Sequence, residues 1–425
     1  MFNKAISKFF RAQCHIPTLR QLHRSCSSIS AVGNQEPRSP IQAIADDQTL
    51  SVQWNDATSR FHHAWLRHHC PCPACLDPST KQRKIDLALI PGHIRPLEVQ
   101  VAKNEVRVRW DDGHESSFDG SWLQENAYDG FVKDNVKPGY GSIAYESEIM
   151  LWNKKIIEAN PPPEYNFDEI KNNPSLIPSL IDKLFRFGFL FVNETPHDKE
   201  SLAQVCEFIG GHVQESLYGR VYALENKDLT HSDVAYLSNA LHGHTDHAYF
   251  EAPAGIQLMH CTHHHGTGGI SLLVDGFNAA KTLYKEKPEA FKILASTEVP
   301  FEYNSQHHMT RVHGPLLELN PFNHELVRVR YNNSRVGPFT NMNLTFEEMG
   351  KFYQAVQTFG SILRRPENEL WFNLTPGRVI AMDNSRTLHG RSDITGSRRL
   401  LGSYVAIDDF LGKWRAIKSA SKKMD

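Results

Sequence analysis

The sequence predicts a mainly β protein, with a small β-rich domain ahead of a double-stranded β-helix of the jelly-roll or cupin type. Three observations favour this fold class. Short runs in which apolar and polar residues alternate recur along most of the 425 residues, as half-buried strands require. A proline run at 161–163 divides these runs into two regions. The second region also contains helical spacing, which fits helices laid outside the strands of a β-helix.

The first thirty residues differ in composition from the rest of the chain. Five basic residues lie among serine, phenylalanine and leucine, and no acidic residue precedes Glu36. This composition is typical of a mitochondrial transit peptide over residues 1–30, and it predicts a location in the mitochondrial matrix. A disordered basic tail is the alternative. Gly33, Pro37 and Pro40 then indicate a flexible linker over residues 31–44.

The small domain is expected over residues 45–135. Residues 49–54 and 105–110 alternate apolar and polar side chains, which predicts strands of an antiparallel sheet. The same domain contains a candidate zinc site.

Three cysteines of the small domain form the pattern C-x-C-x-x-C, and a histidine follows in a strand and turn segment. These residues are Cys70, Cys72, Cys75 and His114. Three thiolates and one imidazole suit tetrahedral zinc, and a site whose four ligands all come from the protein is structural. His68 and His69 beside the cysteines are alternative ligands, and reduced cysteines in a loop are the alternative to zinc.

The larger domain is expected over residues 165–415. Residues 178–185 and 201–209 have helical spacing, and residues 189–192 between them read as a strand. Further along, short strands are expected to alternate with turns, apart from two helical insertions near residues 277–296 and 345–363. This pattern predicts the β-helix.

Net charge and composition restrict the partners. The net charge is −2, which gives no broad electrostatic attraction to nucleic acid or to an anionic membrane, and no run of about eighteen apolar residues occurs. The seven cysteines are odd in number and unevenly spaced, which favours a reducing compartment over a disulfide framework. We therefore expect neither a nucleic-acid nor a membrane partner, and a small molecule as the ligand.

The pattern with the clearest chemistry is His244-Thr245-Asp246, followed far downstream by His389. On an extended strand, residues two apart point to the same side, so His244 and Asp246 are expected on one face. Two imidazoles and one carboxylate on one face of an octahedral ion leave three positions open, as in non-heme Fe(II) oxygenases. The sequence therefore predicts an iron site that binds a co-substrate and O₂. With 23 histidines in the chain, a chance surface pair is the alternative for His244 and Asp246 alone.

Arg398 follows His389 by nine residues. A guanidinium can bind the distal carboxylate of a 2-oxo diacid through two parallel hydrogen bonds, a geometry that lysine cannot reproduce. Together with the iron ligands, Arg398 predicts 2-oxoglutarate as the co-substrate.

Several passages of the chain resemble the carnitine-biosynthesis hydroxylases, the family of trimethyllysine dioxygenase and γ-butyrobetaine dioxygenase. The resemblance covers residues from about 45 to 415. Its specific passages include Trp65-Leu66-Arg67-His68-His69-Cys70, His244-Thr245-Asp246, Gly266-Thr267-Gly268-Gly269, Arg330-Tyr331-Asn332-Asn333, Leu363-Arg364-Arg365-Pro366-Glu367-Asn368-Glu369 and Leu388-His389-Gly390-Arg391. The resemblance implies a homodimeric dioxygenase that uses Fe(II), 2-oxoglutarate and O₂, with ascorbate as the reductant, and that carries a zinc-bearing β domain at its N-terminus.

The resemblance also implies roles for single residues. Ser271 matches the position of a hydroxyl that helps to hold 2-oxoglutarate. A quaternary ammonium group cannot donate a hydrogen bond, so a cage of aromatic faces is expected to bind it. The residues at the matching substrate-binding positions are Tyr218, Tyr222, Asp233, Tyr236, Asn333 and Tyr404.

Asp233 favours Nε-trimethyllysine as the substrate, hydroxylated to 3-hydroxy-Nε-trimethyllysine in the first step of carnitine biosynthesis. A carboxylate can accept the α-ammonium group of that substrate, whereas it repels the carboxylate of γ-butyrobetaine. Hydroxylation of γ-butyrobetaine to carnitine is the alternative. A catalytically silent zinc-bearing interaction protein and a demethylase of protein-bound trimethyllysine are remoter alternatives.

Overall fold

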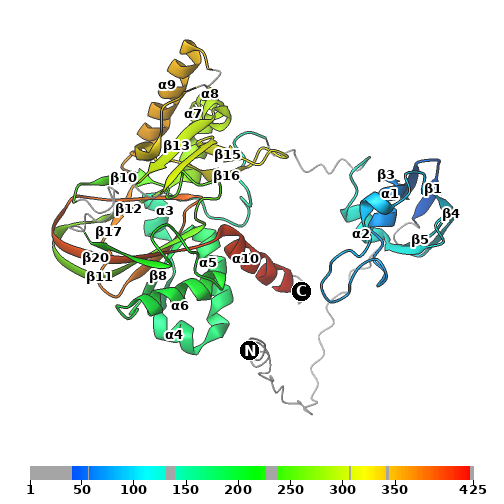
Figure 1. Ribbon diagram of the computed structural model, residues 1–425, viewed down its shortest axis with the longest axis horizontal. Coiled ribbons are helices and arrows are strands. Elements are labelled where there is room, and N and C mark those ends of the chain that lie inside the picture. The colour runs from blue at the N-terminus through cyan, green and yellow to red at the C-terminus, as the bar shows by residue number, and fades with distance from the viewer. Residues whose placement is uncertain are drawn as a thin grey trace, which may run out of the picture. The chain divides into compact units, whose positions relative to one another are not determined.

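The computed structural model describes residues 41–55, 57–130, 139–225, 238–305, 308–340 and 344–421. The chain divides into two compact units, Met1–Asp134 and Asn135–Asp425 (Figure 1). Each unit is described by itself. The predicted transit peptide at 1–30 and most of the predicted linker lie outside the described residues.

The first unit contains two three-stranded antiparallel sheets and two short helices. Its elements are β1 (Gln42–Ala45), β2 (Thr49–Trp54), β3 (Ala57–His62), α1 (His63–His68), β4 (Pro96–Ala102), β5 (Glu105–Trp110), β6 (Glu115–Asp119) and α2 (Gly120–Glu125). The sheet orders are β1-β2-β3 and β4-β5-β6. The two expected strands are present as β2 and β5. Strand β1 begins inside the stretch 31–44 that was expected to be a linker, because the preceding Ile41 is buried in the core of this unit.

The second unit contains two larger sheets that enclose a cavity. Its strands are β7 (Glu164–Asn166), β8 (Phe189–Asn193), β9 (Val221–Glu225), β10 (Leu241–His244), β11 (Ile256–Gly268), β12 (Ser271–Asp275), β13 (Val299–Asn304), β14 (Met309–Gly314), β15 (Leu317–Leu319), β16 (Leu326–Val329), β17 (Leu370–Phe372), β18 (Val379–Asp383), β19 (Thr387–Arg391) and β20 (Ile394–Val405). One sheet has the order β10-β19-β12-β17 and the other β7-β8-β18-β11-β20-β9. This arrangement confirms the predicted double-stranded β-helix.

Two strands of the six-stranded sheet are longer than the short strands that the sequence predicts. Strand β11 has 13 residues and β20 has 12. They pair antiparallel along nearly their whole length, from Ile256 opposite Val405 to Gly268 opposite Ile394. Because side chains alternate between faces, Gln257 and Met259 of β11 point into the cavity while Ile256 and Leu258 pack under helices.

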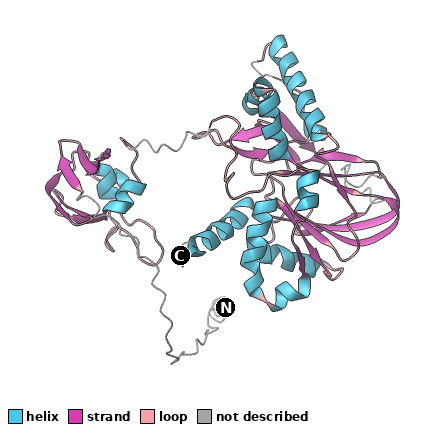
Figure 2. Ribbon diagram, turned by 180° about the vertical axis from the view of Figure 1, so that it is seen from behind, coloured by secondary structure: helices cyan, strands magenta, loops and turns pink. Residues whose placement is uncertain are grey.

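Helices cover the outer face of the six-stranded sheet (Figures 1 and 2). The helices of the second unit are α3 (Lys154–Ala159), α4 (Phe167–Asn172), α5 (Ile177–Phe187), α6 (Lys199–Gly210), α7 (Gly276–Glu286), α8 (Pro288–Ser296), α9 (Phe346–Leu363) and α10 (Ile407–Ser421). Apolar residues of α5, α6 and α10 form one core with the outward residues of β11, β18 and β20. A separate core holds α7, α8 and α9 against β13, β15 and β16.

The predicted helical insertion at 277–296 is two helices. Lys287, between α7 and α8, lies outside the helical region, with φ −145° and ψ 69°. The cause is Pro288, because a proline disfavours the helical region for the residue before it. The insertion at 345–363 is α9, which begins with a capping box between Thr345 and Glu348.

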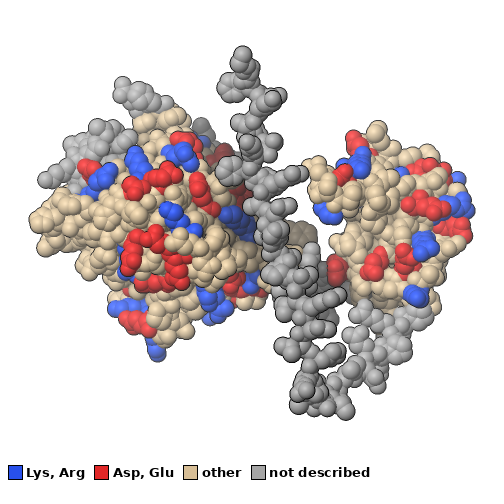
Figure 3. Space-filling view, turned by 90° about the horizontal axis from the view of Figure 1, so that it is seen from below, with Lys and Arg blue, Asp and Glu red and all other residues tan. Residues whose placement is uncertain are grey.

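Surface charge is mixed on the face of the molecule that Figure 3 shows, where Lys and Arg side chains lie between Asp and Glu side chains. None of the helices in the described residues combines the length and the apolar composition needed to cross a membrane.

Candidate active site

A cavity of about 510 Å³ lies between the two sheets of the second unit. Its lining comes from cavity-facing residues of β9, β11, β12, β18, β19 and β20, and from the loops around Asp246 and Asn333. The described residues of the predicted iron, 2-oxoglutarate and substrate sites all line it. They are Tyr218, Tyr222, His244, Asp246, Ser271, Asn333, His389, Arg398 and Tyr404.

His244 and Asp246 meet in a way that differs from the expectation of a shared strand. Strand β10 ends at His244, and Asp246 lies in the following turn. The turn is held by Thr245, whose backbone N–H donates to Tyr331 O at 2.8 Å and whose hydroxyl accepts from Tyr331 N at 3.0 Å. Tertiary hydrogen bonds, and not strand alternation, therefore aim the carboxylate at the histidine.

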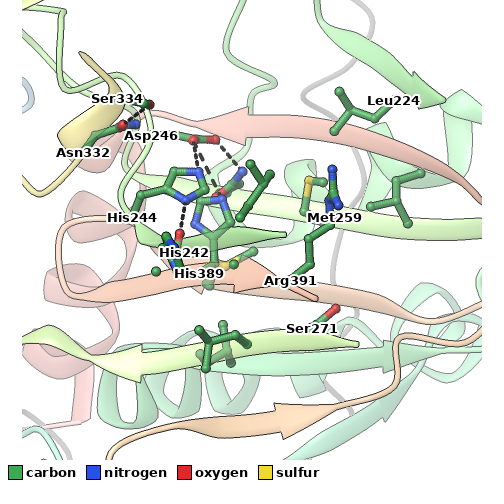
Figure 4. Close-up of a pocket in the computed structure, with 18 of the residues that line it drawn as sticks. Leu224, His242, His244, Asp246, Met259, Ser271, Asn332, Ser334, His389 and Arg391 are labelled. Carbon is green, nitrogen blue, oxygen red and sulfur yellow. Dashed lines mark hydrogen bonds and ion pairs between the residues drawn. The ribbon is translucent and has the colours of Figure 1, made fainter. Parts of the chain in front are cut away.

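His389 reaches the same point from β19, where it is directly opposite His244 of β10. Asp246 Oδ1 lies 3.4 Å from His244 Nε2 and 3.8 Å from His389 Nε2. The ligand atoms of the three side chains all lie within 4.8 Å of one another. Figure 4 shows the three side chains pointing toward one another. This geometry and this set of donors fit a single divalent metal ion such as Fe(II).

Neighbouring groups fix the orientation of these side chains. His244 Nδ1 lies 2.8 Å from His242 O, so this nitrogen carries the proton and Nε2 is left to bind a metal. Asp246 Oδ2 accepts hydrogen bonds from Gln257 Nε2 at 2.5 Å and from Tyr404 Oη at 2.8 Å. Asn384 holds the Asp246 backbone, accepting from its N–H at 2.7 Å and donating to its carbonyl at 3.0 Å.

The charges of the site suit metal binding. Burial by itself raises the pKa of Asp246, but His389 and His244 outweigh it and lower the pKa well below the ordinary range. Burial, with His244 beside it, lowers the pKa of His389 to about 4. At neutral pH Asp246 is therefore a carboxylate and His389 a neutral imidazole, the protonation states in which these two groups act as ligands.

Arg398 and Ser271 meet at another part of the cavity. Arg398 Nη2 donates to Ser271 Oγ at 3.4 Å, and only 5% of Arg398 is exposed. Arg391 lines the same region and donates to Asn239 O at 2.7 Å. Burial, and then the charge of Arg398, lowers the pKa of Arg391 to about 10, so both guanidinium groups remain charged. Two buried cations attract a dianionic ligand.

Aromatic rings form one wall of the cavity. The Tyr218 and Tyr222 ring centroids are 5.4 Å apart, and those of Tyr222 and Tyr404 are 5.7 Å apart. The remaining expected substrate-binding residues, Asp233 and Tyr236, lie outside the described residues.

Several residues at the site were not predicted to have a role. Gln257 and Asn384 contact Asp246 directly, and the guanidinium of Arg335 lies over the rings of Tyr249 and Tyr303 at 5.3 and 4.9 Å. The signal for Gln257 was an amide inside an apolar strand, because a buried polar group requires a partner. No local sequence pattern indicates a role for Arg335 or Asn384.

The cysteine cluster lies in the first unit, and it brings together the four predicted residues. His114 Nε2 lies 3.2 Å from Cys70 Sγ, 3.6 Å from Cys72 Sγ and 3.4 Å from Cys75 Sγ. His69 turns elsewhere, with Nδ1 2.7 Å from Trp65 O and its ring stacked on Trp65. The cluster of three thiols and one imidazole fits tetrahedral zinc.

A buried arginine neutralises part of the charge that this cluster would carry. Arg67 donates to Cys75 Sγ at 3.3 Å and pairs with Asp112 at 2.7 Å. Asp112 in turn accepts from the backbone N–H of His114 at 3.0 Å. Arg67 thus places a positive charge beside Cys75 Sγ, and the link through Asp112 orients His114.

A double-stranded β-helix with two histidines, one aspartate and a buried arginine around one cavity defines the class of metal-dependent oxygenases. Comparison with known proteins agrees. Residues 154–404 match the family described as "Taurine catabolism dioxygenase TauD, TfdA family", and residues 41–124 match "Gamma-butyrobetaine hydroxylase-like, N-terminal". The chain therefore belongs to the TauD, TfdA dioxygenase family, together with the trimethyllysine dioxygenases described next.

The chain is similar along most of its length to several named dioxygenases. Mitochondrial trimethyllysine dioxygenase of Mus musculus is 35% identical over 87% of this chain and 85% of its own length. Trimethyllysine dioxygenase of Neurospora crassa is 32% identical over 94% of this chain and 87% of its own length. Gamma-butyrobetaine dioxygenase of Homo sapiens is 26% identical over 89% and 96%. A solved taurine dioxygenase from Burkholderia xenovorans superimposes with a TM-score of 0.41 at 18% identity, over 55% of this chain and 82% of that one.

Proposed function

We propose that this protein is an Fe(II)- and 2-oxoglutarate-dependent dioxygenase that hydroxylates Nε-trimethyllysine at carbon 3. The observation that carries the proposal is the convergence of His244, Asp246 and His389 in a cavity that also contains Arg398 and an aromatic wall. Identity of 32 to 35% with trimethyllysine dioxygenases over most of the chain favours this substrate over γ-butyrobetaine, whose human dioxygenase is 26% identical.

The chain's own residues bind and orient the metal, the co-substrate and the substrate, and they exclude water from the cavity. His244, Asp246 and His389 would hold the iron, which when bound supplies the oxidation of the substrate by O₂ as 2-oxoglutarate is converted to succinate and CO₂. Arg398 would bind the distal carboxylate of 2-oxoglutarate, and the Ser271 hydroxyl, which accepts from Arg398, keeps that guanidinium in place. Figure 4 shows Ser271 and Arg391 on one side of the metal ligands, and Asn332 and Ser334 on the other.

Substrate recognition would combine aromatic faces with polar groups. Tyr218, Tyr222 and Tyr404 would surround the trimethylammonium group, because ring faces attract a cation that cannot donate hydrogen bonds. We propose that Tyr236 completes the cage, that Asp233 accepts the α-ammonium group, and that Asn333 at the cavity contacts the same end of the substrate.

The remaining proposals concern assembly and location. We propose domain limits of 45–135 and 165–415 for the zinc-bearing and dioxygenase domains, and a homodimer as the assembly. Ascorbate would serve as the reductant and zinc as a structural ion. Several relatives are named as mitochondrial, which supports a mitochondrial location; within the mitochondrion we propose the matrix.

A substrate panel tests the proposal. Purified protein with Fe(II), 2-oxoglutarate, ascorbate and O₂ is offered free trimethyllysine, γ-butyrobetaine, lysine or a trimethyllysine peptide. We expect succinate and a mass gain of one oxygen with free trimethyllysine in preference to the others. Faster turnover of γ-butyrobetaine would identify the alternative hydroxylase, formaldehyde release from the peptide would identify a demethylase, and inactivity on all four would identify an interaction protein.

The role of Asp233 is tested by the Asp233→Asn variant. We expect it to shift the ratio of kcat/KM values toward γ-butyrobetaine by at least about tenfold, because one charge repulsion is removed and one ion pair is lost. An unchanged ratio would remove Asp233 from the recognition of the α-ammonium group.

A further inference from the structure

The two oxygens of the Asp246 carboxylate have different surroundings. Oδ1 faces the imidazoles of His244 and His389, at 3.4 and 3.8 Å. Oδ2 accepts from Gln257 Nε2 and Tyr404 Oη, at 2.5 and 2.8 Å. An oxygen whose lone pairs already accept two hydrogen bonds is a poorer ligand for a cation, so the two donors favour metal binding through Oδ1 alone.

The direction of the Tyr404 hydroxyl is itself set by a second tyrosine. Tyr222 Oη donates to Tyr404 Oη at 2.8 Å, and both residues are buried, with 7% and 3% of their surface exposed. A phenol carries one proton. Because the Tyr404 oxygen accepts from Tyr222, its own proton is directed to Asp246, and a chain Tyr222 to Tyr404 to Asp246 results.

The sheet builds this chain across three neighbouring strands. Tyr222 of β9 pairs with Gly402 of β20, and Tyr404 pairs with Gln257 of β11. A Cβ atom at Gly402 would lie 2.3 Å from Tyr222 Cζ. Glycine at this position therefore leaves the space in which the Tyr222 ring crosses β20 and reaches Tyr404.

We infer that Tyr222 is a positioning residue for the metal site. With Tyr404 and Gln257 it holds Asp246 as a ligand through one oxygen, separately from any contact that its ring makes with a substrate. A carboxylate that bound through both oxygens would fill a further coordination position, and one of the three positions needed for a co-substrate and O₂ would be lost. The inference rests on the proposed metal site but not on the identity of the substrate.

The Tyr222→Phe variant tests this role because it removes one oxygen and keeps the ring. Full-length protein is titrated with Co(II) in place of Fe(II), without O₂ and without substrate, and the dissociation constant and the visible absorption spectrum are recorded. We expect Co(II) to bind about fivefold more weakly, the effect of one lost hydrogen bond, and its spectrum to change with the coordination of the carboxylate. Tyr404→Phe, which removes the direct donor, should weaken binding by about tenfold to a hundredfold.

Two further variants sharpen the test. Tyr165→Phe is the matched control, because its hydroxyl lies 3.1 Å from Ser179 Oγ and outside the cavity, and it should bind Co(II) as the wild type does. Gly402→Ala keeps every donor but displaces the Tyr222 ring, so it should weaken Co(II) binding in the same direction as Tyr222→Phe.

Wild-type affinity and spectrum in Tyr222→Phe would overturn the inference, and so would an equal loss in Tyr165→Phe, which would indicate general loosening. If Tyr404→Phe does not fold, Tyr222→Phe decides alone. If the wild type hydroxylates no compound of the panel, the proposed function fails while the Co(II) measurements still decide the role of Tyr222. In the Fe(II) enzyme we also expect Tyr222→Phe to raise the ratio of succinate to hydroxylated product.

Discussion

Arg398 is a charged residue that water hardly reaches, since only 5% of it is exposed and its strand faces the cavity at this position. Burial lowers the pKa of Arg398, yet a guanidinium remains protonated at neutral pH. A buried charge of this kind favours an anionic ligand, and we propose that the distal carboxylate of 2-oxoglutarate is that ligand.

Replacement of Arg398 by lysine should therefore impair the use of 2-oxoglutarate. We expect the KM for 2-oxoglutarate to rise about tenfold to a hundredfold, because lysine keeps the charge but loses one of two parallel hydrogen bonds. Succinate formation at varied 2-oxoglutarate measures the effect. Arg399→Lys is the matched control, since Arg399 faces the other side of β20 and pairs with Glu225 at the surface. Equal changes in both variants would contradict the assignment.

His260 gives the protein a pH dependence of stability that is separate from the metal site. Burial, with His197 nearby, lowers the pKa of His260 from 6.5 to about 4. Between these values the unfolded chain takes up a proton that the folded protein does not, so stability falls as the pH falls from 6.5 toward 4.

The loss attributable to His260 should reach about 2 kcal/mol between about pH 7.5 and about pH 5. Urea unfolding of His260→Leu and of the wild type at both pH values measures it, and the variant should lose less stability on acidification by that amount. His263→Leu, at an exposed position of the same strand, is the control. An unchanged pH dependence in His260→Leu would remove His260 as the cause.

At the scale of elements, one buried ion pair joins four segments around the β18–β19 turn. Arg386 contacts both oxygens of Asp275, at 3.1 and 2.7 Å, and also donates to Arg186 O and Met150 O. Asp275 at the same time accepts from Trp152 N and from the first backbone N–H groups of α7. The pair thus fixes the turn that precedes β19, the strand that carries His389.

Arg386→Met should destabilise the protein by about 3 to 5 kcal/mol, because it leaves the Asp275 carboxylate buried without its cation. Urea unfolding measures the free energy of unfolding. The double variant with Asp275→Asn should lose less of this free energy than the two single variants lose in sum. Arg365→Met breaks an exposed pair with Glu286 and should cost less than about 1 kcal/mol. A loss below about 1 kcal/mol in Arg386→Met would contradict the anchoring role.

The sequence predicted those elements of the fold whose signal is local. Periodicity identified β2, β5, α5 and α9, and the spacing of cysteines identified three members of one cluster. The turn at Asp246 could not be predicted, because its conformation depends on hydrogen bonds between Thr245 and Tyr331, 86 residues away. The lengths of β11 and β20 likewise depend on each other and not on either segment alone. Gln257 and Asn384 became visible as partners of Asp246 only through these distant pairings.

At the scale of the whole molecule, the two units have independent apolar cores. The core of the first unit is small and rests on residues such as Phe61, Trp110 and Phe118. A bound metal adds its binding free energy to the folding of such a unit, because the unfolded chain does not present the four ligands together. The cysteine cluster is therefore expected to matter for the stability of this unit and not for the chemistry in the other.

Removal of zinc should destabilise the first unit selectively. We expect about one zinc per wild-type chain by elemental analysis, and a chelator or His114→Ala should lower the melting temperature of one calorimetric transition while the other is unchanged. His69→Ala is the matched control, because His69 bonds to Trp65 O and should leave the zinc content intact. Zinc retained in His114→Ala but lost in His69→Ala would identify His69, and not His114, as the fourth zinc ligand.

The pairing of His244 with His389 across β10 and β19 makes metal binding depend on the register of these strands after refolding. A slip of one residue between these strands would turn one imidazole to the opposite face, so a chain that refolds in the wrong alignment would lack the third ligand. Retention of iron after refolding therefore reports the correct register of these two strands. A measurement of metal affinity can distinguish native molecules from misassembled ones that have the same secondary structure content.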